Sequence, residues 1–259
     1  MRAVARTLAV LLAAGGVPSG LARTPVVVVD PGHGGSQEGA AGADGTLEKN
    51  LALELSRKLR DALVKEVTAQ VLLTREKDAH VPLSDRVAFA NRYQPDLFIS
   101  VHANSMPTRK QRERSEGIET YFLSASASGE DAQRTAAREN DDGPRSTKKK
   151  GGDTLAFILS DLQRTEAHVD SSRLAYAVHQ KLVLATGAVD RGVQQAPFYV
   201  LTGVEAPAIL VEVGFISHPG EGKKLTESAY QEALARAIAA GVRSFLAEVA
   251  ARDDQLARP

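Results

Sequence analysis

The 259-residue chain contains no cysteine, which excludes disulfide bridges, thiolate metal sites and a cysteine nucleophile together. Basic and acidic residues number 32 each, so the chain lacks the basic excess typical of a general nucleic-acid binder. It also lacks a Gly-x-Ser-x-Gly elbow from which a serine triad would start. Outside residues 1–22, no segment is apolar enough to cross a membrane. The length and the 43% hydrophobic content fit one large globular domain, with or without an insertion.

Residues 1–22 have the composition of a secretory signal peptide. Arg2 and Arg6 precede the apolar run LAVLLAA, and the tripeptide GLA at 20–22 places small residues where a signal peptidase cleaves. The alternative is an uncleaved anchor, but the run is shorter than the roughly 20 residues that a spanning helix needs. We therefore expect cleavage after Ala22, a periplasmic or secreted protein, and a catalytic domain over residues 23–259.

Apolar runs and helical spacing alternate along the rest of the chain. Helices are predicted from residue 48 onward, over 84–93 with Ser84 as the cap, over 171–185 and over 228–250. Strands are predicted at 25–30, 71–74, 97–101, 117–123, 198–201 and 208–213. The alternation predicts an α/β fold with a mostly parallel twisted sheet and helices on both faces.

Polar side chains that suit a metal site lie at the ends of predicted elements. His33 follows the first strand, His102 ends the third, and Glu48 begins the first helix. Because open parallel sheets gather active sites beyond the carboxyl ends of their strands, we expect these side chains to lie together. Two imidazoles and a carboxylate are a donor set used by hydrolytic zinc. Taken singly, each residue has an ordinary structural explanation, such as a helix-start carboxylate that favours the helix dipole.

Glu212 stands between valines in the last predicted strand, where a buried carboxylate is costly unless it is paired or functional. A structural salt bridge with Arg75 or Arg191 is the alternative to a catalytic role. The other histidines stand in predicted turns or helices and are interpreted as surface or structural residues: His80, His168, His179 and His218.

Four motifs in order resemble those of the zinc-dependent bacterial N-acetylmuramoyl-L-alanine amidases: VDPGHGG at 29–35, EK at 48–49, SVHAN at 100–104 and VEVGFIS at 211–217. The resemblance extends from about residue 25 to the last predicted helix. It implies that His33, Glu48 and His102 bind one zinc ion and that Glu212 is the catalytic carboxylate. It also implies that the substrate is peptidoglycan, cut between N-acetylmuramic acid and L-alanine.

The segment RGVQQAPF at 191–198 is similar to the family's segment that lines the substrate groove. Arg191, Gln195 and Arg75 are therefore candidate groove residues. Two other functions compete with the amidase: a zinc peptidase that cuts within wall peptides, and a wall-binding module that has lost activity. The sequence motifs argue against the first, and the retained ligand set and Glu212 argue against the second.

The segment 124–172 interrupts the alternation of strands and helices, and it is far longer than the usual connection of about 4–6 residues. The polar first half predicts a mobile segment, and the second half carries an apolar stripe from Leu155 to Leu162. The sequence REN at 138–140 and this stripe resemble the regulatory insertion of division-associated amidases, where a helix covers the zinc cleft until a partner protein draws it away. The resemblance implies that Glu139 fills zinc's open position and that an activator acts on the stripe. The alternative is a surface loop followed by a helix that packs on the core.

Overall fold

The computed structural model describes residues 24–141 and 166–256. A six-stranded sheet lies at its centre, in the strand order β2-β1-β3-β6-β4-β5. All neighbouring strands are parallel except β4 and β6, which are antiparallel. The strands are β1 (Val26–Pro31), β2 (Gln70–Leu73), β3 (Leu97–Asn104), β4 (Ile118–Leu123), β5 (Asp190–Ala196) and β6 (Ala208–Phe215).

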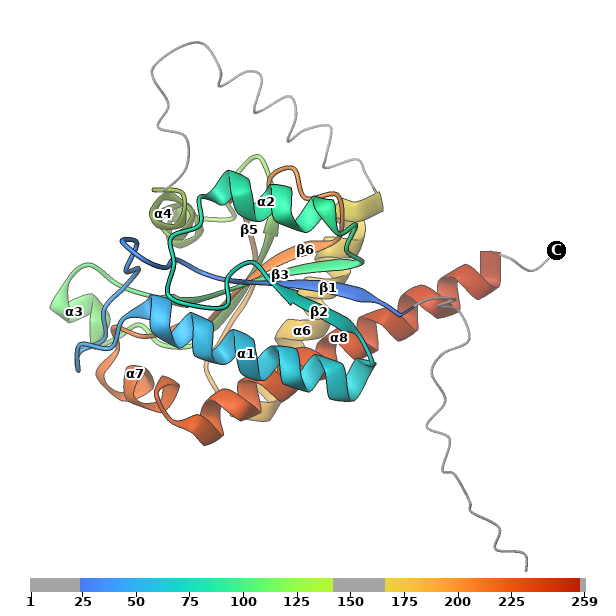
Figure 1. Cartoon of the computed structure of the whole chain (residues 1–259). Coiled ribbons are helices and arrows are strands. Elements are labelled where there is room, and N and C mark those ends of the chain that lie inside the picture. Colours follow the sequence, from blue (N-terminus) through green and yellow to red (C-terminus); the bar gives the residue numbers. More distant parts are fainter. Residues whose placement is uncertain (1–23, 142–165, 257–259) are drawn as a thin grey trace, which may run out of the picture.

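Helices cover both faces of this sheet (Figure 1). One face carries α1 (Glu48–Val67), α6 (Glu166–Thr186) and α8 (Ser228–Leu256), and the other carries α2 (Leu83–Arg92) and α4 (Glu130–Glu139). The short helices α3 (Arg109–Arg112) and α7 (Pro219–Leu225) follow β3 and β6. The predicted α/β class, a mostly parallel sheet covered on both faces, is confirmed.

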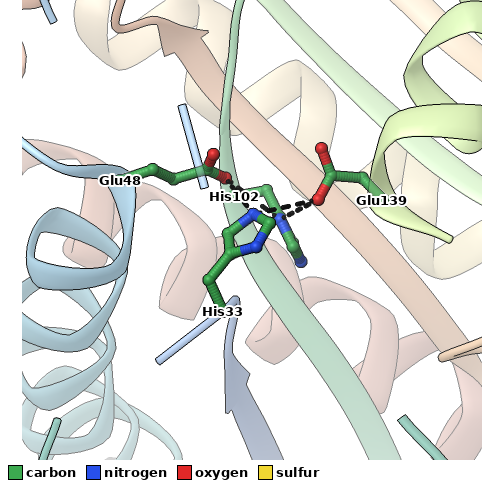
Figure 2. A group of neighbouring side chains, drawn as sticks. All are labelled: His33, Glu48, His102 and Glu139. Carbon is green, nitrogen blue, oxygen red and sulfur yellow. Dashed lines mark hydrogen bonds and ion pairs between the residues drawn. The ribbon is translucent and has the colours of Figure 1, made fainter. Parts of the chain in front are cut away.

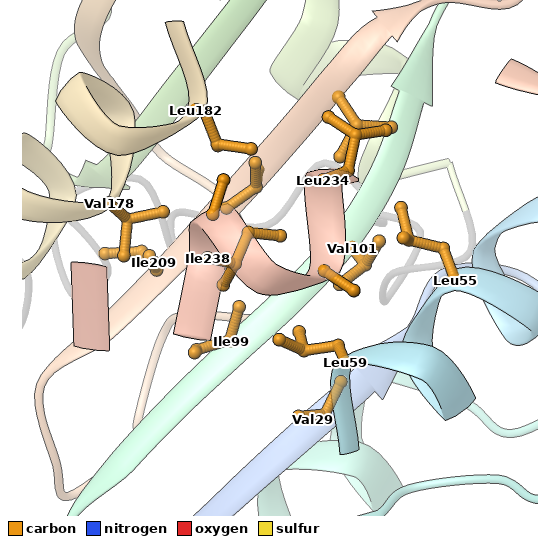
Figure 3. Packing of buried hydrophobic residues seen from close by; sticks show 14 of the residues in the cluster. Val29, Leu55, Leu59, Ile99, Val101, Val178, Leu182, Ile209, Leu234 and Ile238 are labelled. Carbon is orange, nitrogen blue, oxygen red and sulfur yellow. The ribbon is translucent and has the colours of Figure 1, made fainter. Parts of the chain in front are cut away.

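The apolar stripe of α1 packs on the central strands. Leu55 and Leu59 are fully buried beside Val29, Ile99 and Val101 (Figure 3). Because side chains alternate across a strand, intervening residues of the same strands face the second core under α2 and α4. This two-sided burial fixes the register of the strands whose carboxyl ends carry the candidate site.

The predicted strand at 198–201 is wrong: these residues form a turn, and the strand lies just before it, over Asp190–Ala196. The turn is apolar because Phe198, Val200 and Leu201 fill the second core cluster. β5 carries little strand signal because it is an edge strand with a mostly polar sequence, DRGVQQA. The cap assigned to Ser84 is also wrong, since α2 begins at Leu83 and Pro82 holds the cap position.

The polar half of the predicted insertion contains a helix, α4, where a mobile segment is expected. Ala132 and Ala136 bury its inner face against the second core cluster. The apolar stripe from Leu155 to Leu162 and the predicted signal peptide lie outside the described residues. Within residues 24–141 and 166–256, no helix is both long and apolar enough to cross a membrane.

Candidate metal centre

Four side chains converge at the carboxyl ends of β1 and β3 (Figure 2). The Nε2 atom of His33 lies 3.1 Å from Oε1 of Glu48 and 3.1 Å from Oε2 of Glu139. The Nδ1 atom of His102 lies 3.1 Å and 2.9 Å from the same two oxygens. Each residue offers one ligand atom, and all four atoms lie within 4.8 Å of one another. This arrangement could hold one metal ion.

The turn that carries His33 is held by two buried arginines. Arg75 donates to the carbonyl oxygens of Pro31 and Gly32, at 3.0 and 2.7 Å. Arg86 donates to the carbonyl oxygens of Pro31 and His33, at 2.7 and 2.6 Å. His33 has a left-handed backbone with φ 58°, which is uncommon for a residue other than glycine. These hydrogen bonds hold that conformation and so aim the imidazole at the cluster.

Glu48 is fully buried and is oriented by the backbone. Its Oε2 accepts from the amide of Ala40 at 2.8 Å, and its Oε1 accepts from the amide of Ala103 at 3.0 Å. Gly39 makes this close packing possible, because a Cβ there would lie 2.6 Å from the ring of His33 and 2.7 Å from Glu48. A Cβ on Gly32 would likewise lie 2.4 Å from the ring of His102.

The charges of the cluster are strongly coupled. Burial alone would lower the pKa of His33, but the carboxylates of Glu48 and Glu139 outweigh it and raise the pKa to about 9. The same two carboxylates raise the pKa of His102 against its burial. Burial favours the neutral form of Glu48, yet the two imidazoles hold its pKa well below the ordinary range. Two carboxylates therefore need positive charge between them, which either protons or a metal cation can supply.

Two buried atoms without hydrogen bonds favour a metal cation over protons as the source of this positive charge. His33 Nε2 and Glu139 Oε2 are buried and, within the described part of the chain, have no correctly directed hydrogen-bond partner despite their closeness. Ligand atoms around a tetrahedral ion would be about 3.3 Å apart at bond lengths of about 2.0–2.1 Å. The four histidine–glutamate separations of 2.9–3.1 Å are near this value, and all four donor atoms lie within 4.8 Å of one another. The four donors thus fit a metal ion in number and type.

Glu212 lies beside the cluster on β6, as the register partner of His102 on β3. It is fully buried, and burial raises its pKa well above the ordinary range, although the cation of Arg138 opposes that shift. Nη2 of Arg138 donates to its Oε1 at 3.2 Å, while its Oε2 has no hydrogen-bond partner among the described residues. A buried carboxylate whose protonated form is favoured therefore lies next to the candidate metal centre.

Comparisons with known proteins identify the family of this chain. The profile of the N-acetylmuramoyl-L-alanine amidases matches residues 27–244, and these include all the site residues. The chain belongs to this amidase family. It is 35% identical to the amidase AmiA of Escherichia coli K12 over 225 residues, covering 85% of this chain and 75% of AmiA. It is 33% identical to the amidase AmiC of E. coli strain CFT073 over 232 residues, covering 89% of this chain and 55% of AmiC.

The fold of the amidase domain is likewise similar to solved amidases. The crystal structure of N-acetylmuramoyl-L-alanine amidase from Clostridium difficile 630 superposes with a TM-score of 0.65 and 29% identity. The match covers 86% of this chain and 97% of that one. The family predicted from the four motifs is confirmed.

The structure brings five of the predicted residues of this amidase into one site: His33, Glu48, His102, Glu139 and Glu212. The salt bridge of Glu212 is present, but its partner is Arg138 and neither of the two predicted arginines. Arg75 is buried, with the guanidinium donating to backbone carbonyls, so these contacts stabilise the His33 turn. Arg191 and Gln195 lie on β5 next to β4. The groove roles of these two residues and of Arg75 stay predictions.

Three residues that sequence reasoning did not assign surround Glu212. Glu119 on β4 is the register partner of Glu212, and its Oε2 accepts from Asn104 at 2.8 Å. Asn104 in turn accepts through Oδ1 from Nη1 of Arg138 at 2.9 Å. The signal for Glu119 is the one that identified Glu212, a carboxylate inside a buried strand. Arg138 comes from α4, whose folding against the sheet is a tertiary event.

Proposed function

We propose that this amidase hydrolyses the bond between N-acetylmuramic acid and L-alanine in peptidoglycan, with one zinc ion held by His33, Glu48 and His102. The observation that carries the proposal is the position of Glu212. This buried carboxylate with a raised pKa adjoins a ready-made metal centre on the next strand. A metal that activates water and a carboxylate that accepts its proton are together sufficient for water to attack an amide.

The donor set supports zinc over the commoner hard cations. Imidazole nitrogens are ordinary zinc ligands, whereas calcium and magnesium take oxygen ligands. Zinc in this position would act as a Lewis acid that polarises the scissile carbonyl and lowers the pKa of the attacking water toward about 7. With Glu139 withdrawn, the remaining set of two histidines and one glutamate is one that hydrolytic zinc sites use.

Glu212 is proposed as the general base and then the general acid. Its unpartnered Oε2 can accept the proton of the attacking water, because burial favours its protonated form. The same proton then passes to the leaving nitrogen, which must be protonated because an amide anion is a very poor leaving group. Ala103 and Ala40 keep Glu48 fixed during this transfer through their backbone N–H groups.

Digestion of purified peptidoglycan with mass analysis of the products tests the activity. An amidase gives free stem peptides that begin with L-alanine, together with bare glycan. Trimmed peptides would identify the peptidase alternative, and intact wall that retains bound protein would identify the binding module. A Glu212→Gln variant serves as the matched inactive control.

We further propose that α4 holds the domain in an inhibited state. Glu139 is buried, and its Oε2 occupies one corner of the ligand cluster, which is where water or substrate would need access. Replacing it by alanine should raise the rate of wall digestion at equal zinc content. Gln133→Ala, on the exposed side of the same helix, should leave the rate as it is. A Glu139→Ala protein that binds zinc yet digests wall no faster would refute the inhibition.

Export and activation complete the proposal. Peptidoglycan lies outside the cytoplasmic membrane, so residues 1–22 should be removed as a signal peptide. N-terminal sequencing of the native protein tests this, and a soluble cytoplasmic chain that begins at Met1 would contradict it. An activator that draws α4 away by contacting residues from Leu155 to Leu162 is part of the same proposal, although this stretch lies outside the described residues.

A further inference from the structure

A polar pocket of about 550 Å³ lies between the start of α4 and the β4–β5 edge of the sheet. Glu119, Tyr121, Arg191 and Gln194 line it from the strands, and residues 128–132 line it from the other side. Glu119 places the pocket beside the proposed catalytic carboxylate, because Glu119 is the register partner of Glu212 on the adjoining strand. The pocket therefore lies next to the reacting groups and is bounded by the helix proposed to block them.

Arg191 is fixed in this pocket. Its Nε donates to Oε1 of Glu119 at 2.6 Å, and Glu119 is itself buried and held by the hydroxyl of Tyr121 at 2.7 Å. The guanidinium carbon lies 5.1 Å from the ring centroid of Phe215. These contacts occupy one edge and one face of the guanidinium. They leave Nη2 directed at α4, where it meets a carboxylate oxygen of Asp131 at 3.1 Å.

The docked helix α4 places one carboxylate at each of two positively charged positions. Asp131 lies at Arg191, and Glu139 lies at the candidate metal centre. Eight residues separate them, which is about 12 Å along an α-helix. On the sheet, Arg191 on β5 lies three strands from His102 on β3, about 14 Å at the usual strand spacing. The docked helix thus matches a molecule with an oxygen at the metal and a carboxylate about 12–14 Å away.

We propose that Arg191 is a specificity-determining residue that binds a carboxylate of the stem peptide, and that Asp131 takes this position while α4 is docked. The inference rests on the proposed amidase function. A guanidinium held by its Nε edge offers its remaining N–H groups to a carboxylate with good geometry. An extended peptide advances about 3.3–3.6 Å per residue. The carboxylate that reaches Arg191 is therefore about three to four residues beyond the scissile amide.

Two muramoyl tripeptides test this, identical except that the third residue ends in a free carboxylate or in a carboxamide. The Glu139→Ala protein should cleave the carboxylate form with a kcat/KM about tenfold or more above that of the carboxamide, as expected for one charge-assisted contact. Adding Arg191→Gln should bring the ratio of the two values to about one. Adding Arg236→Gln, which removes an exposed arginine on α8, should leave the ratio unchanged.

Equal cleavage of both peptides by the Glu139→Ala protein would overturn the inference and leave the amidase function standing. So would an Arg191→Gln protein that keeps the preference. Cleavage of neither peptide would refute the amidase function, and the subsite with it. Should Arg191→Gln fail to fold, Arg191→Lys replaces it: the charge stays but the planar fork is lost, so the ratio should fall below that of the parent.

Discussion

Replacing Arg138 distinguishes between two roles of this residue, because the two roles predict opposite changes in the rate of wall digestion. It could serve α4 as an anchor, or it could serve the active enzyme by orienting Glu212. Its Nε donates to Glu139 at 2.6 Å, its Nη1 to Asn104 at 2.9 Å, and its Nη2 to Glu212 at 3.2 Å. Because Arg138 belongs to α4, its contacts with Asn104 and Glu212 are lost when the helix is released. We therefore predict that Arg138→Met raises wall digestion.

The size of the expected rise in activity follows from the free energy of the contacts that the docked helix loses with Arg138. A hydrogen bond to a charged group contributes about 1.5–3 kcal/mol net, and removing one partner of a buried ion pair costs about 3–5 kcal/mol. The side chain of Arg138 is 27% exposed, so solvent weakens this only in part. Taking about 3 kcal/mol for the whole group, the ratio of docked to released helix falls about a hundredfold. The measured rise in activity reaches about a hundredfold only if α4 is docked in nearly all molecules of the parent protein.

Dye release from labelled wall, at equal zinc content and equal melting temperature, measures the effect. Arg109→Met is the matched control, since this exposed arginine of α3 pairs only with the nearby Glu113 among the described ion pairs and should change the rate less than about twofold. A fall in activity for Arg138→Met would refute the reasoning. It would mean that Arg138 acts on Glu212 during turnover and that α4 stays in place.

Three further outcomes are expected. Glu212→Gln should keep zinc by metal analysis but lose about 10²–10⁴-fold in turnover, and a variant that loses zinc would make Glu212 a ligand. His102→Ala should lose zinc and activity together, and equal zinc in variant and parent would contradict its assignment. Burial would raise the pKa of Asp30, but Arg86 at 2.8 Å and the hydroxyls of Thr74 and Ser100 together outweigh it and hold the pKa below its ordinary value of 3.8. The stability from this pair is therefore full above pH 3.8 and is lost as the pH falls through the folded-state pKa, so Asp30→Asn should flatten the acid limb of the unfolding curve measured by circular dichroism.

Local signals account for much of the fold. The β-branched run before Asp30 and the four-residue spacing of Leu51, Leu55 and Leu59 each reflect burial of one side of an element, and both are present as predicted. The sequence does not predict β5, because an edge strand buries few side chains and its sequence therefore carries little hydrophobic signal. The neighbouring turn was mistaken for a strand because its apolar side chains fill a core that only the packed helices create.

Motif order and hydrophobic period are properties of the chain, so they are enough to predict the family and the α/β class, and to propose which residues form the site. His33, Glu48 and His102 could be named from these properties alone. The surroundings of Glu212 are different, because they depend on how distant segments pack. The antiparallel pairing of β4 with β6 places Glu119 opposite Glu212, and the docking of α4 places Arg138 against it. Arg138 and Glu212 are 74 positions apart in the chain, so their contact depends on strand register and helix docking, which no local pattern specifies.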